Sequence, residues 1–102
     1  MKRTERHHLV ACYDVDTTSL AGERRLRKVA KVCESYGHRV QKSVFEISVT
    51  PADYERMMRK VLGIVDLEQD TFRVYFLPGE FSKFVRVIGL DHGVDFEGPL
   101  IL

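Results

Sequence analysis

The stretch Phe45-Glu46-Ile47-Ser48-Val49-Thr50-Pro51-Ala52-Asp53 passes from a strand pattern to a helix start. Apolar side chains occupy every second position up to Val49, which is the period of a β-strand. Thr50 is suited to cap a helix, and Pro51 fits the first helical position because its missing N–H needs no partner there. Asp53 then faces the positive end of the helix dipole. The sequence therefore predicts a strand that leads directly into a helix.

The strand before this helix extends back to Arg39 and is apolar on both sides. Phe45, Ile47 and Val49 share one face, whereas Val40 and Val44 share the other. An antiparallel sheet with a single covering layer usually wets its second face. A strand over residues 39–49 therefore indicates that another layer or another subunit covers that face.

The rest of the chain alternates between strand and helix patterns. We predict a strand at 8–15, a helix capped by Thr18 or Ser19 and ending at Gly37, a helix from Thr50 to Val65, strands at 71–77 and 84–89, and a short edge strand at 98–102. We interpret these elements as an α+β, ferredoxin-like βαββαβ arrangement with an additional short C-terminal strand. Two helices would cover one face of an antiparallel sheet.

The size of the chain favours one domain that pairs with a second copy. It has 102 residues, 44% of them hydrophobic, so we expect a single domain over residues 1–102. A chain of this length buries a small core, and the open sheet face would be covered in a symmetric homodimer.

Positive charge is concentrated in the first part of the chain. Residues 1–42 contain ten Lys and Arg against five Asp and Glu, a net +5, whereas the remainder contains six against ten, a net −4. Arg24, Lys28 and Lys31 follow each other at helical spacing along one face of the first predicted helix. Such a face attracts phosphate backbones, although an ordinary solvated helix face has the same appearance.

Asp14 is the candidate for metal chemistry because it ends an apolar strand. The alternation of β-structure places it on the same side as Val10 and Cys12. Mg²⁺ accepts one or two carboxylates and keeps most of its waters. A helix cap or a salt bridge to Arg39 would explain the same residue. In a symmetric dimer, two copies of Asp14 near the two-fold axis could converge on one ion.

Several other classes of protein are poorly supported. The apolar runs are far too short to span a bilayer, and the N-terminus lacks the apolar region of a secretory signal, so we expect a cytoplasmic protein. Cys12 and Cys33 lack metal-ligand spacing and are predicted to be buried thiols. No Gly-rich phosphate loop and no Ser, His and Asp arrangement for acyl transfer is evident.

Four segments together resemble the CRISPR-associated Cas2 family. They are Tyr13-Asp14-Val15, the run Arg25-Leu26-Arg27-Lys28-Val29-Ala30-Lys31, the run from Tyr36-Gly37 to Arg39-Val40-Gln41-Lys42-Ser43-Val44-Phe45-Glu46, and the closing Glu97-Gly98-Pro99-Leu100-Ile101-Leu102. The resemblance covers nearly the whole chain. It implies a ferredoxin-like homodimer at the centre of the spacer-acquisition complex, beside the Cas1 integrase and in contact with duplex DNA.

The resemblance also implies a metal-dependent endonuclease that acts on DNA or RNA with Mg²⁺ as cofactor. Asp14 matches the family's metal ligand and is the expected catalytic residue, with Tyr13 and Phe45 as supporting residues. The expected nucleic-acid-binding residues are Arg25, Arg27, Lys28, Lys31, Arg39 and Lys42. Two alternatives remain open: a scaffold that binds DNA without catalysis, and a toxin-like ribonuclease on the same fold.

Overall fold

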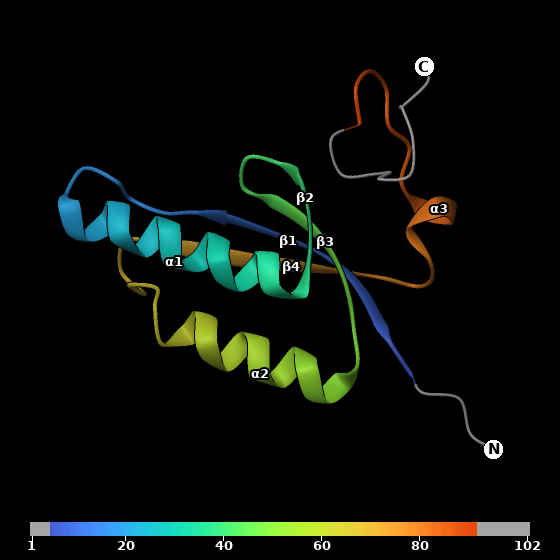
Figure 1. Ribbon diagram of the computed structural model, residues 1–102, viewed down its shortest axis with the longest axis horizontal. Coiled ribbons are helices and arrows are strands. Elements are labelled where there is room, and N and C mark those ends of the chain that lie inside the picture. The colour runs from blue at the N-terminus through green and yellow to red at the C-terminus, as the bar shows by residue number, and fades with distance from the viewer. Residues whose placement is uncertain (1–4, 92–102) are drawn as a thin grey trace.

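A computed structural model describes residues 5–91 and places two helices on one face of a four-stranded antiparallel sheet (Figure 1). The strands lie in the order β2-β3-β1-β4, with β1 in the interior of the sheet. The elements are β1 (His7–Asp14), α1 (Leu20–Tyr36), β2 (Gly37–Gln41), β3 (Val44–Val49), α2 (Pro51–Leu62), β4 (Thr71–Leu77) and α3 (Phe81–Phe84). The predicted α+β, ferredoxin-like βαββαβ order is confirmed.

Both long helices begin where their capping residues predict. The Ser19 side chain accepts a hydrogen bond from the Gly22 N–H at 3.0 Å and caps α1. Thr50 accepts from the Asp53 N–H at 3.2 Å, and Pro51 is the first residue of α2. These side chains satisfy N–H groups that have no partner inside the helix. The second helix ends at Leu62, three residues earlier than predicted.

The predicted strand over residues 39–49 is two strands. β2 and β3 pair as an antiparallel hairpin whose turn is Lys42-Ser43, with an irregular register between Arg39 and Gln41. Apolar alternation continues on both sides of this turn, and the turn itself contains neither Gly nor Pro. Periodicity alone therefore could not reveal where the chain reverses.

The prediction of a strand over residues 84–89 is wrong. Phe81–Phe84 forms the short helix α3, and residues 85–91 contain no strand. A strand requires a hydrogen-bonded neighbour. In the described sheet, the only paired strands are β1, β2, β3 and β4, so residues 85–91 have no strand partner there. The predicted edge strand at 98–102 lies outside the described residues.

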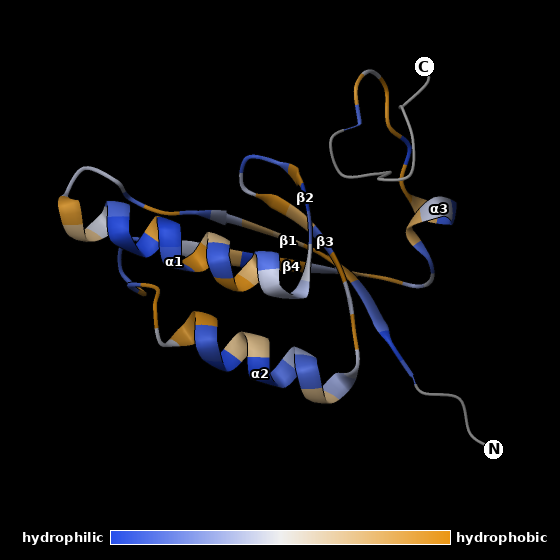
Figure 2. Ribbon diagram, viewed as in Figure 1, coloured by the Kyte–Doolittle hydropathy of each residue, from blue (hydrophilic) through white to orange (hydrophobic). Residues whose placement is uncertain are grey.

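Alternation along the strands divides the sheet into a covered face and an open face. On the covered face, Leu9, Ala11 and Tyr13 of β1 and Phe45 and Ile47 of β3 are buried against the helices. Figure 2 shows hydrophobic colour along the strands and hydrophilic colour on much of the helix surface that faces the viewer. We call the other side the open face; it carries Val10, Cys12, Asp14, Val44, Glu46, Arg73 and Tyr75. Within residues 5–91, no helix is long and apolar enough to cross a membrane.

Candidate functional site

Asp14 is an exposed carboxylate at the end of a strand whose neighbouring residues are buried. Tyr13 and Val15 on either side are 6% and 8% exposed. The Asp14 carboxylate makes no hydrogen bond or ion pair with any residue that the structure describes. The two structural explanations for this acid also fail, because Ser19 caps α1 and Arg39 pairs with Glu34. Its oxygens are therefore available to an external cation.

Tyr13 and Phe45 support Asp14 from the covered face of the sheet. The Tyr13 ring stacks between Phe45 and Phe72, with ring centroids 6.1 and 6.2 Å apart. Burial raises the pKa of Tyr13, an effect that the nearby Arg39 guanidinium partly opposes. Because Tyr13 points into the core, the next side chain along the strand must point to the open face. Both residues therefore act on the candidate site through packing.

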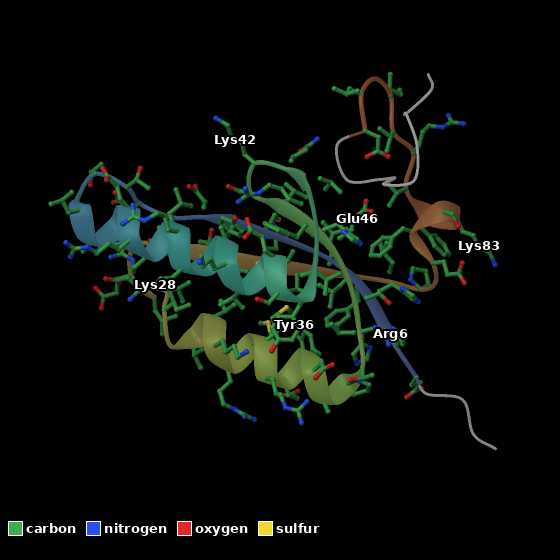
Figure 3. All side chains as sticks on the ribbon, viewed as in Figure 1. Arg6, Lys28, Tyr36, Lys42, Glu46 and Lys83 are labelled. Carbon is green, nitrogen blue, oxygen red and sulfur yellow. The ribbon has the colours of Figure 1, made fainter. Side chains whose placement is uncertain are left out.

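The turn of the β2–β3 hairpin lies beside the end of β1. The Tyr13 N–H donates to the Ser43 carbonyl at 3.1 Å. This contact brings the backbone of Lys42 close to Asp14, and Figure 3 shows the Lys42 side chain projecting outward from the turn. On the other side, Asp14 pairs with Thr71, and Arg73 lies one row further along the open face. The fold thus places a cationic residue on each side of Asp14, Lys42 in the hairpin turn and Arg73 on β4.

Four of the basic residues of α1 form an exposed cluster. Arg24, Arg27, Lys28 and Lys31 line a shallow hollow on the surface of this helix, and we call them the α1 basic cluster. The helix covers the face of the sheet opposite to Asp14, and Figure 3 shows Lys28 on it. The structure therefore separates the α1 basic cluster from the candidate metal ligand.

Arg25, predicted to bind nucleic acid, lies instead in a buried ion pair. Its Nε and Nη2 atoms donate to the Asp70 carboxylate at 2.7 and 3.2 Å, and only 16% of its side chain is exposed. Leu26 and Val29 turn the adjacent face of α1 toward the core, which draws Arg25 inward beside them. The positive charge of Arg25 is thus already matched within the protein.

Arg39 has a mixed environment. Its guanidinium lies 5.2 Å from the centre of the Phe45 ring and 3.6 Å from a carboxylate oxygen of Glu34. Nearly half of the Arg39 side chain is exposed. An exposed ion pair of this length contributes little stability, so the guanidinium can exchange Glu34 for a phosphate.

Asp70 is a buried charged residue that the sequence pattern did not reveal. Its side chain is fully buried and accepts hydrogen bonds from the backbone N–H groups of Asp16 at 3.0 Å and Asp66 at 2.8 Å, in addition to Arg25. These donors hold the pKa of Asp70 at about 2. The sequence showed only a charged run between Asp66 and Asp70, which is typical of a solvated turn. No local signal identifies which acid in such a run turns inward.

The two thiols differ in environment. Cys33 is fully buried, and burial raises the pKa of its thiol to about 12, so it remains protonated and unreactive. Cys12 is half-buried on the open face, two residues from Asp14. The prediction of a buried thiol is therefore confirmed for Cys33 and only partly met by Cys12.

A single copy of the chain supplies one carboxylate for a metal ion. Within residues 5–91, no group of three or more His, Cys, Asp and Glu side chains is placed to hold one. Mg²⁺ requires few protein ligands because it retains most of its waters, and an exposed carboxylate without partners fits that requirement. A second carboxylate could come from the same residue of another copy.

Comparisons with known proteins agree on one family. The model of the family described as CRISPR associated protein Cas2 matches residues 7–84. A CRISPR-associated endoribonuclease Cas2 of Moorella thermoacetica is 42% identical over 95 residues, covering 93% of this chain and 99% of that protein. A CRISPR-associated endonuclease Cas2 of Halalkalibacterium halodurans is 43% identical over 89 residues, covering 87% of this chain and 93% of that protein.

A solved structure shows the same arrangement of elements. The crystal structure of Streptococcus pyogenes Cas2 at pH 6.5 superposes with a TM-score of 0.73 and is 43% identical, covering 80% of this chain and 99% of that one. The matched segment includes β1 with Asp14, the hairpin with Lys42 and the buried Asp70. The chain therefore belongs to the CRISPR-associated Cas2 family.

Proposed function

We propose that this protein is a Mg²⁺-dependent endonuclease of CRISPR adaptation in which Asp14 is the metal ligand. The observation that carries the proposal is the position of Asp14: its exposed carboxylate lies on the open face of the sheet, makes no hydrogen bond or ion pair within residues 5–91, and is flanked in the chain by two buried residues. The relatives named endoribonuclease and endonuclease support phosphodiester hydrolysis as the reaction. We place this activity in the cytoplasm.

The site is completed in a symmetric homodimer. Apolar residues on the open face and in the segment after α3 would otherwise remain in contact with water, including Tyr75 at 49%, Ile88 at 90% and Leu90 at 59% exposure. Residues of the segment after α3, among them Val85, Val87 and Ile88, line a hollow together with Val10 and Val44. A second copy that covers this face would bury these residues and bring a second Asp14 toward the first.

The residues around Asp14 have complementary tasks in hydrolysis. When bound, Mg²⁺ activates a water molecule and offsets the negative charge that develops on the phosphoryl oxygens. Asp14 holds its position on the open face through the packing of Tyr13. Lys42 on the adjacent turn would hold the nucleic-acid backbone through its phosphates, whereas Arg39 lies beside Phe45 on the covered face, away from Asp14.

A second function is favoured by the position of the α1 basic cluster. Its four exposed cations lie across the sheet from Asp14, so a duplex bound along α1 need not be cut there. This separation supports a scaffold role in which the dimer holds duplex DNA beside the Cas1 integrase during spacer acquisition. The scaffold role requires only shape and charge, and it is compatible with the nuclease role.

The Asp14→Asn variant tests the nuclease proposal. Purified protein is incubated with single-stranded RNA or duplex DNA, with Mg²⁺ or with EDTA, and the initial cleavage rate is measured. We expect Mg²⁺-dependent cleavage by the wild type and a loss of roughly 100-fold or more in the variant. The fold should survive, because the Asp14 side chain contacts no partner among residues 5–91.

The cleavage experiment, together with assays of spacer acquisition and growth in cells, distinguishes the alternatives. Equal cleavage by wild type and Asp14→Asn would remove Asp14 from the mechanism. Absence of cleavage by both proteins, with spacer acquisition retained in cells that carry Cas1, would leave the scaffold role alone. Cleavage of RNA only, with growth arrest on expression without Cas1, would favour the toxin-like ribonuclease.

A further inference from the structure

We propose that Asp70 is a positioning residue for Asp14, held in place by Arg25. The inference rests on the proposed function, since it concerns how the candidate metal ligand is kept in place. Asp70 is the one buried charged residue in the described part of the chain, and it immediately precedes β4. Its side chain joins the loop before β4 to two segments that are distant in sequence, the loop after β1 and helix α1.

The Asp70 carboxylate uses both of its oxygens. Oδ1 accepts from the Asp16 N–H at 3.0 Å and from Nη2 of Arg25 at 3.2 Å. Oδ2 accepts from the Asp66 N–H at 2.8 Å and from Nε of Arg25 at 2.7 Å. The loop after β1, the loop before β4 and helix α1 are therefore tied to one side chain that is shielded from water.

Asp16, two residues after Asp14, is held from three sides. Its N–H is bound by Asp70, and its own carboxylate accepts from the N–H and hydroxyl of Thr18 at 2.9 and 2.7 Å. Its carbonyl packs against Gly22 of α1 so closely that an added Cβ would lie 1.8 Å from the oxygen. The backbone that follows Asp14 thus has very little freedom.

Asp14 is the last residue of β1, and Asp70 holds the backbone next to it on both β1 and β4. Asp14 pairs with Thr71, which directly follows Asp70 in the chain. Val15 is buried, and Asp16 is bound to the same carboxylate. The loop after β1 and the start of β4 therefore meet at Asp70, next to the Asp14–Thr71 pair. No contact of this kind reaches the Asp14 side chain, so the influence passes through the backbone.

Such control matters because one ion has to be shared between two chains. Two Asp14 carboxylates on separate copies can bind the same ion only if the backbone of each copy holds its Asp14 at a fixed distance from the two-fold axis. Residues that orient metal ligands typically change metal affinity by 10- to 100-fold when they are replaced. This gives Asp70 a measurable role that differs from general stability.

The test uses Asp70→Asn, which keeps the shape of the side chain but offers an amide N–H₂ where one oxygen accepted hydrogen bonds. Arg25→Lys is the second variant, because it keeps the charge and the carboxylate while losing the paired donors. Val61→Ala, a core change in α2, serves as a matched destabilised control, since Val61 is 2% exposed and lies on another element. Asp14→Asn is the reference for loss of the ligand.

Two quantities are measured on each folded homodimer: amide hydrogen exchange over residues 14–18 and the Kd for Mn²⁺ in a calorimetric titration. We expect Asp70→Asn to speed exchange in this segment and to raise the Kd for Mn²⁺ roughly 10-fold, with a smaller change for Arg25→Lys. Val61→Ala should leave both quantities near those of the wild type.

The outcomes distinguish this inference from the function it rests on. Unchanged exchange over residues 14–18 in both Asp70→Asn and Arg25→Lys would show that the carboxylate does not restrain this segment. Faster exchange with unchanged Mn²⁺ affinity would show that Asp70 restrains this segment without affecting metal binding by Asp14. If Asp14→Asn binds Mn²⁺ as the wild type does, the metal site itself is wrong, and the positioning role fails with it.

Discussion

Two aspartates, Asp14 at the end of β1 and Asp70 just before β4, have opposite environments. Asp14 is exposed and has no partner in the described chain, whereas Asp70 is buried and accepts four hydrogen bonds. A carboxylate whose oxygens are all occupied stabilises the protein, and one that is free can bind a cation. Strand alternation was enough to identify Asp14, because only its own residue and its neighbours decide which way it points. Asp70 depends on Arg25 and Asp16, which are far away in the sequence.

The buried ion pair predicts a specific loss of stability in acid. The donors around Asp70 lower its pKa from the ordinary 3.8 to about 2 in the folded protein. Its contribution is therefore complete above about pH 5 and is lost as the pH falls through 2. This loss should amount to about 2 kcal/mol in the free energy of unfolding, measured by urea denaturation at pH 7, 4 and 2.

Replacement of Asp70 by Asn should remove most of this acid dependence. The variant should be less stable than the wild type at pH 7, and the difference should shrink toward pH 2. Asp53→Asn is the control, since Asp53 forms an exposed pair with Arg56 and its removal should cost under about 1 kcal/mol. A difference for Asp70→Asn that stays constant from pH 7 to pH 2 would contradict this explanation.

At the scale of the elements, helices were easier to predict than strands. Ser19, Thr50 and Pro51 mark the helix starts by chemistry that is local in sequence. The β2–β3 hairpin and the segment after α3 were misjudged, because pairing between strands depends on neighbours that a linear pattern does not show. The same limit applies to Arg25: the sequence shows a cation, but not that its charge is paired with the distant Asp70 in the fold.

Helix α1 is predicted to bind nucleic acid through its exposed cluster. Charge reversal at Lys28 and Lys31 should weaken binding of a duplex at least roughly 10-fold and reduce the salt dependence of log K by about 2. The same change in net charge at Arg56 and Arg59, both exposed on α2, is the matched control. Fluorescence anisotropy at several salt concentrations measures both quantities. Equal losses from both pairs would indicate attraction by net charge alone.

For the molecule as a whole, the open face is the basis of the predicted homodimer. One layer of helices covers one face of the sheet (Figure 1), and apolar residues such as Val10 and Val44 lie on the other face. The predicted homodimer follows from this imbalance and from the need for a second Asp14. Its geometry could not be predicted from the sequence, because the residues that would meet belong to two chains.

A charge on the open face should separate the two copies. Val44→Lys places an ammonium group where a partner sheet would exclude water, which should weaken the dimer at least roughly 100-fold. Leu62→Lys is the control, because Leu62 is 63% exposed at the end of α2 and lies outside this face. Sedimentation equilibrium measures both. A dimer that persists in Val44→Lys and dissociates in Leu62→Lys would locate the interface elsewhere.

Whether two copies of Asp14 share one metal ion is tested by counting the divalent ions bound per dimer. Mn²⁺ is titrated into the wild-type protein and into Asp14→Asn, and bound metal is followed by electron paramagnetic resonance. The prediction is one ion for every two chains in the wild type and none at this site in the variant. One ion per chain, or binding that is unchanged in Asp14→Asn, would contradict it.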